Sequence, residues 1–186
     1  MNRHPARLAV FDLDGTLLDT DDALVAPFIA LGVARDDITF GHVLADECDR
    51  HGIDVAAYLD LYDPGQAQPF AGVNELLTHV EGTRWAVCSN KQPRSGHAEL
   101  DRLGWKPDVA LFSDAFDGPK RLGPVLDALG VTADEIAFVG DTEHDRVCAT
   151  DVGVPFGLAG WNPRTRAEPG DVVLHAPMDV LTLLER

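Results

Sequence analysis

The sequence predicts an α/β protein whose core is a parallel sheet, and three observations lead to this prediction. Short apolar runs alternate with helix-like patterns along most of the chain. The runs are apolar throughout rather than at every second position, which is typical of strands covered by helices on both faces. One stretch, residues 20–68, breaks the alternation because it contains helix-like patterns only. We therefore expect a Rossmann-like, three-layer α/β/α core with a small all-helical segment inserted after the first strand.

Six apolar runs have the length and composition of buried strands. The first of them, RLAVF, is followed directly by a group of acidic residues. Because most of the later runs are separated by helix-like patterns, they are expected to lie parallel in one sheet. The expected strands are residues 7–11, 84–88, 109–112, 136–139, 155–158 and 172–174.

Three helix-like patterns separate the later strands. Residues 72–80 follow Pro69, and residues 94–104 follow Pro93. The third pattern, residues 121–130, ends at a glycine, the residue that most readily adopts the left-handed conformation found just past helix ends. These segments are the expected connections that cover the two faces of the sheet.

Residues 20–68 are the expected helical segment, and residues 1–19 and 69–186 together are the expected core. The segment carries ten acidic side chains and two arginines, so its net charge of −8 is half of the chain's −16. Asp19 is expected to begin its first helix as an N-cap residue. Three patterns in the segment predict helices, namely residues 21–32, 40–52 and 54–63.

The composition limits the classes of function. With 186 residues, 45% of them hydrophobic, the chain is long enough for one domain with a sizeable core. The net charge of −16 argues against a nucleic-acid or acidic-membrane partner, because both are bound by clustered Lys and Arg. No apolar run approaches the roughly 18 residues of a membrane span, and the N-terminal residues lack the apolar stretch of a signal peptide. The three cysteines form no CxxC pair, which favours a reduced, cytoplasmic location with Cys88 and Cys148 in the core.

Polar side chains stand at the carboxyl ends of three expected strands, the edge at which such sheets bind ligands. Two aspartates follow the first strand, a serine and an asparagine follow the second, and two further aspartates follow the fourth. A lysine precedes the fourth strand. The set consists of Asp12, Asp14, Ser89, Asn90, Lys120, Asp141 and Asp145.

Such a concentration of carboxylates must be compensated. Two like charges ~4 Å apart repel by about 4 kcal/mol at an effective dielectric constant of about 20. The group therefore needs a divalent cation, a protonated member, or both. All-oxygen ligands favour a hard ion, Mg²⁺ before Ca²⁺. A calcium-binding EF-hand is excluded because its glycine is the sixth loop residue, whereas Gly15 is the fourth counting from Asp12.

These residues resemble the motifs of the haloacid dehalogenase superfamily, in its phosphatase branch with a short helical cap (phosphoglycolate-phosphatase-like). The sequence DLDGT at residues 12–16 is similar to the family's DxDGT motif, and GDTEHD at residues 140–145 is similar to GDxxxD. Ser89 falls on the second motif and Lys120 on the third, so the resemblance covers nearly the whole chain in the expected order. The helical segment lies where the family carries its cap.

The resemblance implies a role for each residue. Asp12 would be the nucleophile that forms an aspartyl-phosphate, and Asp14 the general acid and base. Mg²⁺ would be held by the Asp12 carboxylate, the Asp14 backbone carbonyl and Asp141. The remaining residues would bind the phosphoryl group (Ser89, Asn90 and Lys120) or support the site (Asp145, Gly15 and Thr16).

Several alternatives stay open. Asp14–Gly15 is also a hairpin signal, although its companions along the chain favour a site. Lys91 stands too close behind Ser89 to be the separate phosphate lysine, and Arg121 after Lys120 replaces the proline common in relatives. His42, His51, Tyr58 and Tyr62 could contact substrate or simply pack the helical segment. Residues 160–170 are expected to be a surface loop, at most at the rim of the site.

The predicted function is Mg²⁺-dependent hydrolysis of a small phosphorylated metabolite, with no nucleic-acid or membrane partner. Two rival functions are a phosphoryl-transferring mutase similar to β-phosphoglucomutase and a non-catalytic binding or regulatory protein. The acidic helical segment argues against polyphosphate substrates and is compatible with small or amine-bearing esters. The particular ester and the oligomeric state are not defined by the sequence.

Overall fold

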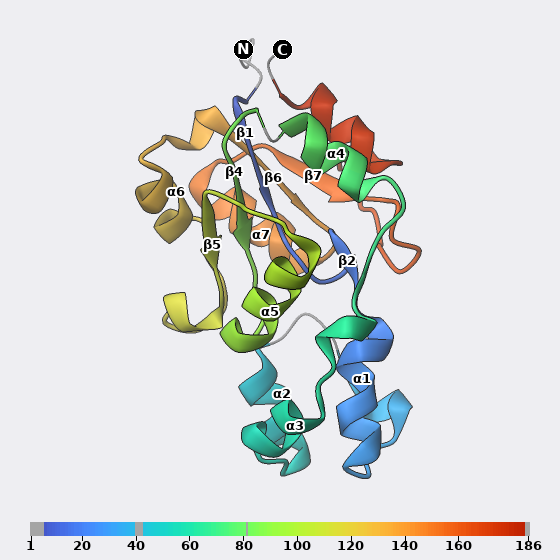
Figure 1. Ribbon diagram of the computed structural model, residues 1–186. Helices are drawn as coiled ribbons and strands as arrows, with labels where there is room; N and C mark the ends of the chain where they lie inside the picture. Colours follow the sequence, from blue (N-terminus) through green and yellow to red (C-terminus); the bar gives the residue numbers. More distant parts are fainter. Residues whose placement is uncertain (1–5, 40–42, 81, 185–186) are drawn as a thin grey trace.

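The computed structural model describes residues 6–39, 43–80 and 82–184. Its centre is a sheet of six parallel strands in the order β5-β4-β1-β6-β7-β8 (Figure 1). Each strand lies within about one residue of an expected one at either end, which confirms the predicted parallel α/β sheet. The strands are β1 (Leu8–Phe11), β4 (Trp85–Cys88), β5 (Val109–Leu111), β6 (Ile136–Gly140), β7 (Phe156–Ala159) and β8 (Val173–Leu174).

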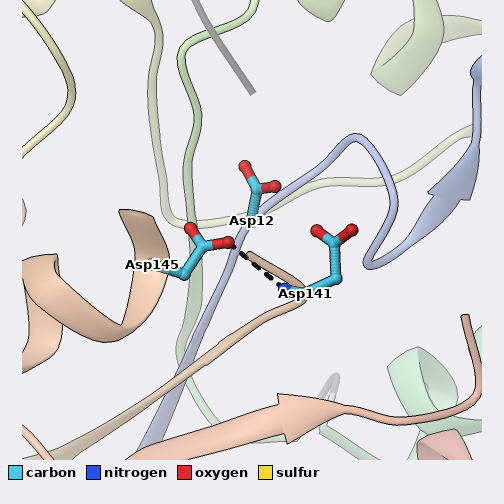
Figure 2. A group of neighbouring side chains, drawn as sticks. All are labelled: Asp12, Asp141 and Asp145. Carbon is cyan, nitrogen blue, oxygen red and sulfur yellow. Dashed lines mark hydrogen bonds between the residues drawn. The ribbon is translucent and has the colours of Figure 1, made fainter. Parts of the chain in front are cut away.

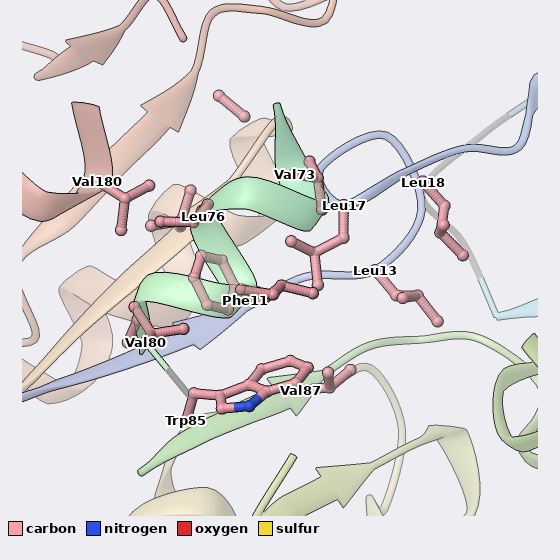
Figure 3. Packing of buried hydrophobic residues seen from close by; sticks show 14 of the residues in the cluster. Phe11, Leu13, Leu17, Leu18, Val73, Leu76, Val80, Trp85, Val87 and Val180 are labelled. Carbon is pink, nitrogen blue, oxygen red and sulfur yellow. The ribbon is translucent and has the colours of Figure 1, made fainter. Parts of the chain in front are cut away.

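Helices cover both faces of this sheet, giving the three-layer architecture. Alternate residues of β1 point to opposite faces, so Ala9 and Phe11 belong to one hydrophobic cluster and Leu8 and Val10 to another. Figure 3 shows the first cluster, in which Phe11 packs between the sheet and a helix. The first face carries α4 (Val73–Val80), α5 (Pro93–Leu103) and the short helix η5 (Pro177–Thr182), and the second carries α6 (Gly123–Leu129) and α7 (Glu143–Val152).

The described residues of the segment 20–68 form helices around a small core of their own, at the carboxyl ends of the strands (Figure 1). Phe28 and Tyr58 pack with their ring centroids 4.7 Å apart, and Cys48 is fully buried beside them. The treatment of this helical segment as a separate domain stays a prediction. Its elements are α1 (Asp21–Ala30), η1 (Arg35–Asp37), α2 (Leu44–His51), α3 (Val55–Leu61) and η2 (Pro64–Gln66).

Two short strands join the helical segment to the core, and the sequence reasoning did not find them. β2 (Leu18–Asp19) pairs antiparallel with β3 (Gln68–Pro69), so the chain enters and leaves the segment side by side. The prediction that Asp19 is an N-cap is wrong, because Asp19 is an exposed residue of β2 and Thr20 precedes the helix without a side-chain cap. The two strand residues push the helix start to Asp21.

The other expected helices and the burial of two cysteines agree with the structure where it describes the residues. The helix expected over 40–52 begins at Leu44, and residues 40–42, with His42 among them, lie outside the described part of the chain. Cys88 and Cys148 are buried in the second hydrophobic cluster, as expected, and neither forms a disulfide. Across the described residues, we find no helix with the length and apolar character needed to cross a membrane.

Candidate active site

The loop after β1 places Asp12 and Asp14 at the carboxyl edge of the sheet, between β4 and β6. This is the point where successive strands add to opposite sides of β1, at which open α/β sheets bind ligands. The loop turns sharply because two successive backbone N–H groups, those of Leu17 and Leu18, both donate to the Leu13 carbonyl. The Asp14–Gly15 pair therefore lies in this loop and does not form a hairpin between two strands of the main sheet.

Gly15 is required by both its backbone and its surroundings. Its φ of +80° lies in the left-handed region that L side chains avoid. A Cβ added at Gly15 would lie 2.3 Å from an Asp141 oxygen. The absence of a side chain therefore lets the β1 loop approach Asp141, and the Thr16 hydroxyl then donates to Asp141 over 3.2 Å. Both predicted supporting residues of this loop lie at the site.

Three aspartates from two ends of the sequence meet at this edge (Figure 2). One oxygen each of Asp12, Asp141 and Asp145 lies within 4.8 Å of the others. Asp145 is completely buried, and its Oδ2 accepts from the backbone N–H groups of Asp141 and Thr142 at 3.2 and 3.0 Å. Asp145 therefore fixes the start of α7 and the position of Asp141.

Lys120 lies between two of these aspartates, and its side chain is 4% exposed. Its Nζ is 2.6 Å from Asp12 Oδ1 and 2.6 Å from Asp145 Oδ1. Burial alone would lower the pKa of the Lys120 ammonium, but the two carboxylates outweigh burial and hold its pKa well above the usual value. The Lys120 backbone N–H donates to Asn90 Oδ1 over 2.7 Å. Asn90 therefore positions the chain that carries Lys120.

The negative charge of this cluster exceeds what Lys120 neutralises. Burial raises the pKa of Asp12 to about 7, and the pull of Lys120 only partly offsets it. Burial and the nearby Asp12 and Asp145 raise the pKa of Asp141 to about 8. Carboxyl groups with such pKa values lack a compensating positive charge in this arrangement. The electrostatics therefore fit a site that takes a further cation.

The donors available at the site suit a hard divalent ion. Asp12 and Asp141 offer carboxylate oxygens, whereas Asp145 uses one oxygen on Lys120 and the other on the α7 N-terminus. Asp141 is itself held by Thr16 and by Asn162, whose Nδ2 donates to Asp141 Oδ2 over 2.9 Å. A ligating carboxylate held in this way by outer hydrogen bonds is typical of metal sites. The residues therefore fit Mg²⁺, with Asp145 in a supporting position.

A second buried lysine, which the sequence analysis left without a role, lies on the other side of the β1 loop. Lys91 Nζ is 2.7 Å from Asp14 Oδ1, 3.0 Å from Glu99 Oε1 and 3.1 Å from the Tyr62 hydroxyl. The Tyr62 hydroxyl also donates to Glu99 Oε1. Burial opposes the charge of Lys91, but Asp14 and Glu99 outweigh it and raise the pKa of the ammonium. Burial raises the pKa of Glu99 to about 7 against the pull of Lys91.

Ser89 lies at the end of β4 beside this second lysine. Its side chain is buried, and its Oγ accepts from the Lys91 backbone N–H over 3.3 Å. Ser89, Asn90 and Lys91 all line the same cavity as Asp12 and Asp14. The structure therefore brings together all the residues that the sequence analysis placed at this edge, and it adds Lys91.

The loop at residues 160–170 contributes more than the expected surface position. Asn162 is 2% exposed and donates to the Gly15 carbonyl as well as to Asp141, and Trp161 Nε1 donates to the Thr16 carbonyl over 2.9 Å. The prediction of a surface loop is thus wrong for Asn162, whereas Trp161 is half-buried and most of residues 163–170 are exposed. The position of Trp161 and Asn162 directly after β7, at the carboxyl edge of the sheet, is the signal that could have found them.

A cavity of about 110 Å³ is lined by most of these polar residues, namely Asp12, Asp14, Ser89, Asn90, Lys91, Lys120 and Asp141. The core forms its floor, and the helical segment forms the opposite wall. Glu47 also lines the cavity, but its carboxylate is engaged by Arg50 and Thr39. Thr20, Asp21 and Thr39 are the other polar residues of this wall. Its remaining lining residues are aliphatic or aromatic, namely Leu24, Phe28, Ile38, Leu44, Tyr58 and Tyr62.

Known proteins are similar to this chain in sequence. The sequence profile of the haloacid dehalogenase-like hydrolases matches residues 43–159. A phosphoglycolate phosphatase of Mesorhizobium japonicum is 30% identical, with 96% of this chain and 95% of the relative covered. An N-acetylmuramic acid 6-phosphate phosphatase of Pseudomonas aeruginosa is 26% identical, with 100% and 98% covered.

Solved structures support the fold independently. The crystal structure of a predicted phosphatase from Clostridium acetobutylicum has a TM-score of 0.80 at 16% identity, covering 96% of this chain and 100% of that one. The L-2-haloacid dehalogenase of Xanthobacter autotrophicus, with chloropropionic acid covalently bound, has a TM-score of 0.71 at 20% identity, covering 96% and 98%. At these identities the likeness shows the fold alone.

The parallel sheet and the acidic edge define a Rossmann-like protein with its polar site at the carboxyl ends of the strands. The profile match and the relative that is 30% identical identify the family within this class. The chain belongs to the haloacid dehalogenase-like hydrolase family.

Proposed function

We propose that the chain is a Mg²⁺-dependent phosphatase that hydrolyses a small phosphate monoester through an aspartyl-phosphate intermediate. The observation that carries the proposal is the pairing of Asp12 with Lys120 at 2.6 Å, at the floor of a cavity that also contains Asp14 and Ser89. Relatives named for phosphoglycolate and for N-acetylmuramic acid 6-phosphate support monoester hydrolysis as the reaction. We also propose that the protein is cytoplasmic.

The first half of the reaction transfers the phosphoryl group to Asp12. A carboxylate oxygen of Asp12 attacks phosphorus while the bond between phosphorus and the ester oxygen breaks, and Asp14 gives its proton to the departing alcohol. Lys120 and the Ser89 hydroxyl lie where they can hold the phosphoryl oxygens. Such positioned positive charge and donors stabilise the transition state more than the ground state.

The second half regenerates the enzyme. Asp14, now ionised, takes a proton from water as the water oxygen attacks phosphorus, and the bond between phosphorus and Asp12 breaks to release inorganic phosphate. Mg²⁺, held by the carboxylates of Asp12 and Asp141 and by the Asp14 backbone carbonyl, would neutralise charge on the transferring group. Asp145 keeps Lys120 and Asp141 in place through both halves.

The cavity supports a small substrate with a largely uncharged organic part. The wall from the helical segment is mostly apolar, and both buried lysines of the cavity are engaged by carboxylates. Arg164 at the rim pairs with Asp21. Thr20 is buried at the cavity, and its hydroxyl has no hydrogen-bond partner among the described residues, so it could bind a substrate oxygen.

A panel of small phosphate monoesters with Mg²⁺ tests the proposal, with inorganic phosphate as the measured product. Asp12→Asn should lower turnover by at least about 10³-fold because it removes the nucleophile. Asp22→Asn is the matched control, because Asp22 is exposed and lies outside the cavity. No turnover of any ester, or full activity of Asp12→Asn, would favour the binding-protein alternative.

The mutase alternative predicts a different fate for the same intermediate. If the phosphoryl group on Asp12 passes to a second hydroxyl of the substrate, added acceptor alcohols should suppress release of inorganic phosphate and yield a new ester. A hydrolase should release phosphate at nearly the same rate with or without the acceptor. The ratio of new ester to inorganic phosphate, measured over a range of acceptor concentrations, separates the two activities.

A further inference from the structure

The group around Lys91 is built as completely as the group around the proposed nucleophile. An ammonium has three N–H donors, and those of Lys91 have three acceptors at 2.7, 3.0 and 3.1 Å, in Asp14, Glu99 and Tyr62. The Lys91 side chain is 2% exposed and that of Glu99 is 0% exposed. Lys91 is therefore held in one place by groups on three sides.

The three acceptors come from different parts of the molecule. Asp14 belongs to the β1 loop, and Glu99 to helix α5 of the core. Tyr62 follows directly after α3 and belongs to the helical segment. Its hydroxyl accepts from Lys91 and donates to Glu99, so both functions of that oxygen are used. The arrangement is complete only while the helical segment rests on α5.

We infer that Lys91 is a positioning residue that fixes the Asp14 carboxylate for proton transfer, and that Tyr62 makes this position depend on the docked helical segment. The inference rests on the proposed function. Lys91 binds Oδ1 of Asp14, which leaves Oδ2 as the oxygen that serves the ester oxygen and then water. The Asp14 side chain is 22% exposed, and Asp14 lines the cavity, so that substrate can reach it.

The inference makes a prediction that a purely structural role does not make. Protonation of the departing oxygen matters greatly for an alkyl phosphate, whose alkoxide is a poor leaving group, and little for 4-nitrophenyl phosphate. Positioned general acids typically contribute about 10²–10⁴-fold. Loss of Lys91 should therefore reduce hydrolysis of the alkyl ester much more than hydrolysis of the aryl ester, chiefly in kcat.

The first experiment measures kcat and KM of Lys91→Met with a small alkyl phosphate and with 4-nitrophenyl phosphate. We expect the alkyl-to-aryl ratio of kcat/KM to fall by at least about 30-fold, within the range for general acids. The same substitution in an Asp14→Asn background should leave the ratio unchanged, because Lys91 acts through Asp14. An equal fall for both esters, or a further fall in that background, would overturn the inference.

Tyr62→Phe provides a second test that removes one hydroxyl and no charge, should Lys91→Met fail to fold. We expect the alkyl-to-aryl ratio to fall in the same direction, by roughly 3- to 10-fold, consistent with the loss of one hydrogen bond. Arg102→Ala is the matched control. Arg102 lies in α5, like Glu99, and donates to the Ala67 carbonyl of the helical segment, but it makes no hydrogen bond with Asp14. A ratio that falls equally in both variants contradicts a specific role for Tyr62.

These outcomes are distinguishable from failure of the proposed function itself. If the wild-type protein hydrolyses neither ester, the phosphatase proposal fails. If it hydrolyses both and the ratio is unaffected by Lys91→Met and Tyr62→Phe, only the inference about Lys91 fails.

Discussion

The candidate active site contains two groups of the same design, each with a buried lysine between two carboxylates. Lys120 lies 2.6 Å from both Asp12 and Asp145, and Lys91 lies 2.7 Å from Asp14 and 3.0 Å from Glu99. The Lys120 group is made by the sheet and the loops at its edge. The Lys91 group includes Tyr62 of the helical segment. One half of the proposed chemistry therefore depends on the core alone, and the other half depends on a contact between the core and the helical segment.

This difference matches the two kinds of work that the residues are proposed to do. The nucleophile must be in place before any substrate arrives, and a rigid sheet edge provides that. Proton transfer by Asp14 is useful only when substrate is enclosed. A contact with the helical segment is a direct way to link the two events, since closure of a segment over a site commonly completes the set of catalytic groups.

The largest expected effect distinguishes the two lysines. Lys120→Met should reduce kcat for alkyl and aryl esters alike by about 10²–10³-fold, because it removes positive charge beside the phosphoryl group rather than beside the departing oxygen. Lys91→Met should affect mainly the alkyl ester. Steady-state kinetics with both esters checks this, with circular dichroism to show that each variant is folded.

If Lys120→Met and Lys91→Met changed the alkyl-to-aryl ratio of kcat/KM equally, the two lysines would not have different roles. Both substitutions leave buried carboxylates without their partner, which typically costs 3–5 kcal/mol of stability, about as much in one group as in the other. Stability alone therefore cannot separate the lysines. The alkyl-to-aryl ratio can, because it depends on which oxygen each group serves.

The next effect concerns the metal, which should bind beside one group only. Mg²⁺ at about 100 times its Kd should stabilise the fold by about 2.7 kcal/mol, or roughly 5–10 °C in Tm for a chain of this size. The shift should be larger at pH 8 than at pH 5, because protons compete for Asp12 and Asp141, whose pKa values are raised to about 7 and about 8. Thermal unfolding with Mg²⁺ or with a chelator measures it.

Two matched substitutions locate the metal. Asp141→Asn should abolish the Mg²⁺-dependent shift in Tm, whereas Glu99→Gln should retain it, because Glu99 belongs to the Lys91 group. A shift that survives Asp141→Asn would place the ion elsewhere.

The core could be predicted from the sequence because its signals are local. The run LAVF is apolar at every position, and the glycine at 130 ends its helix in the left-handed conformation, as expected. The Lys120 group was predictable too, because Asp12, Lys120 and Asp145 stand at strand ends or in recognisable motifs. All of these depend on the sheet edge, which the strand pattern defines.

The Lys91 group could not be predicted in the same way. Glu99 lies in the middle of a helix, and Tyr62 lies directly after α3 in another part of the chain. Nothing local distinguishes them from ordinary packing residues, since their meeting depends on how the helical segment rests on α5. The strands β2 and β3, of two residues each, were missed because they are too short to show a period.

A smaller effect, the pH dependence of stability, also distinguishes the two groups. Glu99 has an ordinary pKa of 4.5 when unfolded and about 7 when folded, so the folded state binds the extra proton between these values. Stability from this group is therefore fully present below pH 4.5 and is lost as pH rises through 7, by about 3 kcal/mol. Glu99→Gln should flatten the slope of unfolding free energy in this window.

The measurement is urea denaturation between pH 4.5 and 7.5 at saturating Mg²⁺. The metal holds Asp12 and Asp141 ionised, so it should suppress their contribution and leave that of Glu99. If Glu99→Gln keeps the full slope, the carboxyl group that titrates belongs to the Lys120 group instead.

The smallest expected effect is on substrate choice, and it follows from what both lysines are doing. All three donors of Lys91 are used by Asp14, Glu99 and Tyr62, and Lys120 is shared by two carboxylates and, as proposed, by the phosphoryl group. Neither lysine is therefore available to a second anionic group on the substrate. A small alkyl phosphate whose alkyl group carries no charge should therefore be preferred over phosphoglycolate by about tenfold in kcat/KM, equivalent to about 1.4 kcal/mol. Phe28→Lys, which adds a positive charge to the apolar wall, should reduce or reverse that preference. A wild-type preference for phosphoglycolate would mean that one lysine leaves its carboxylates to bind substrate, and the likeness between the two groups would then hold only without substrate.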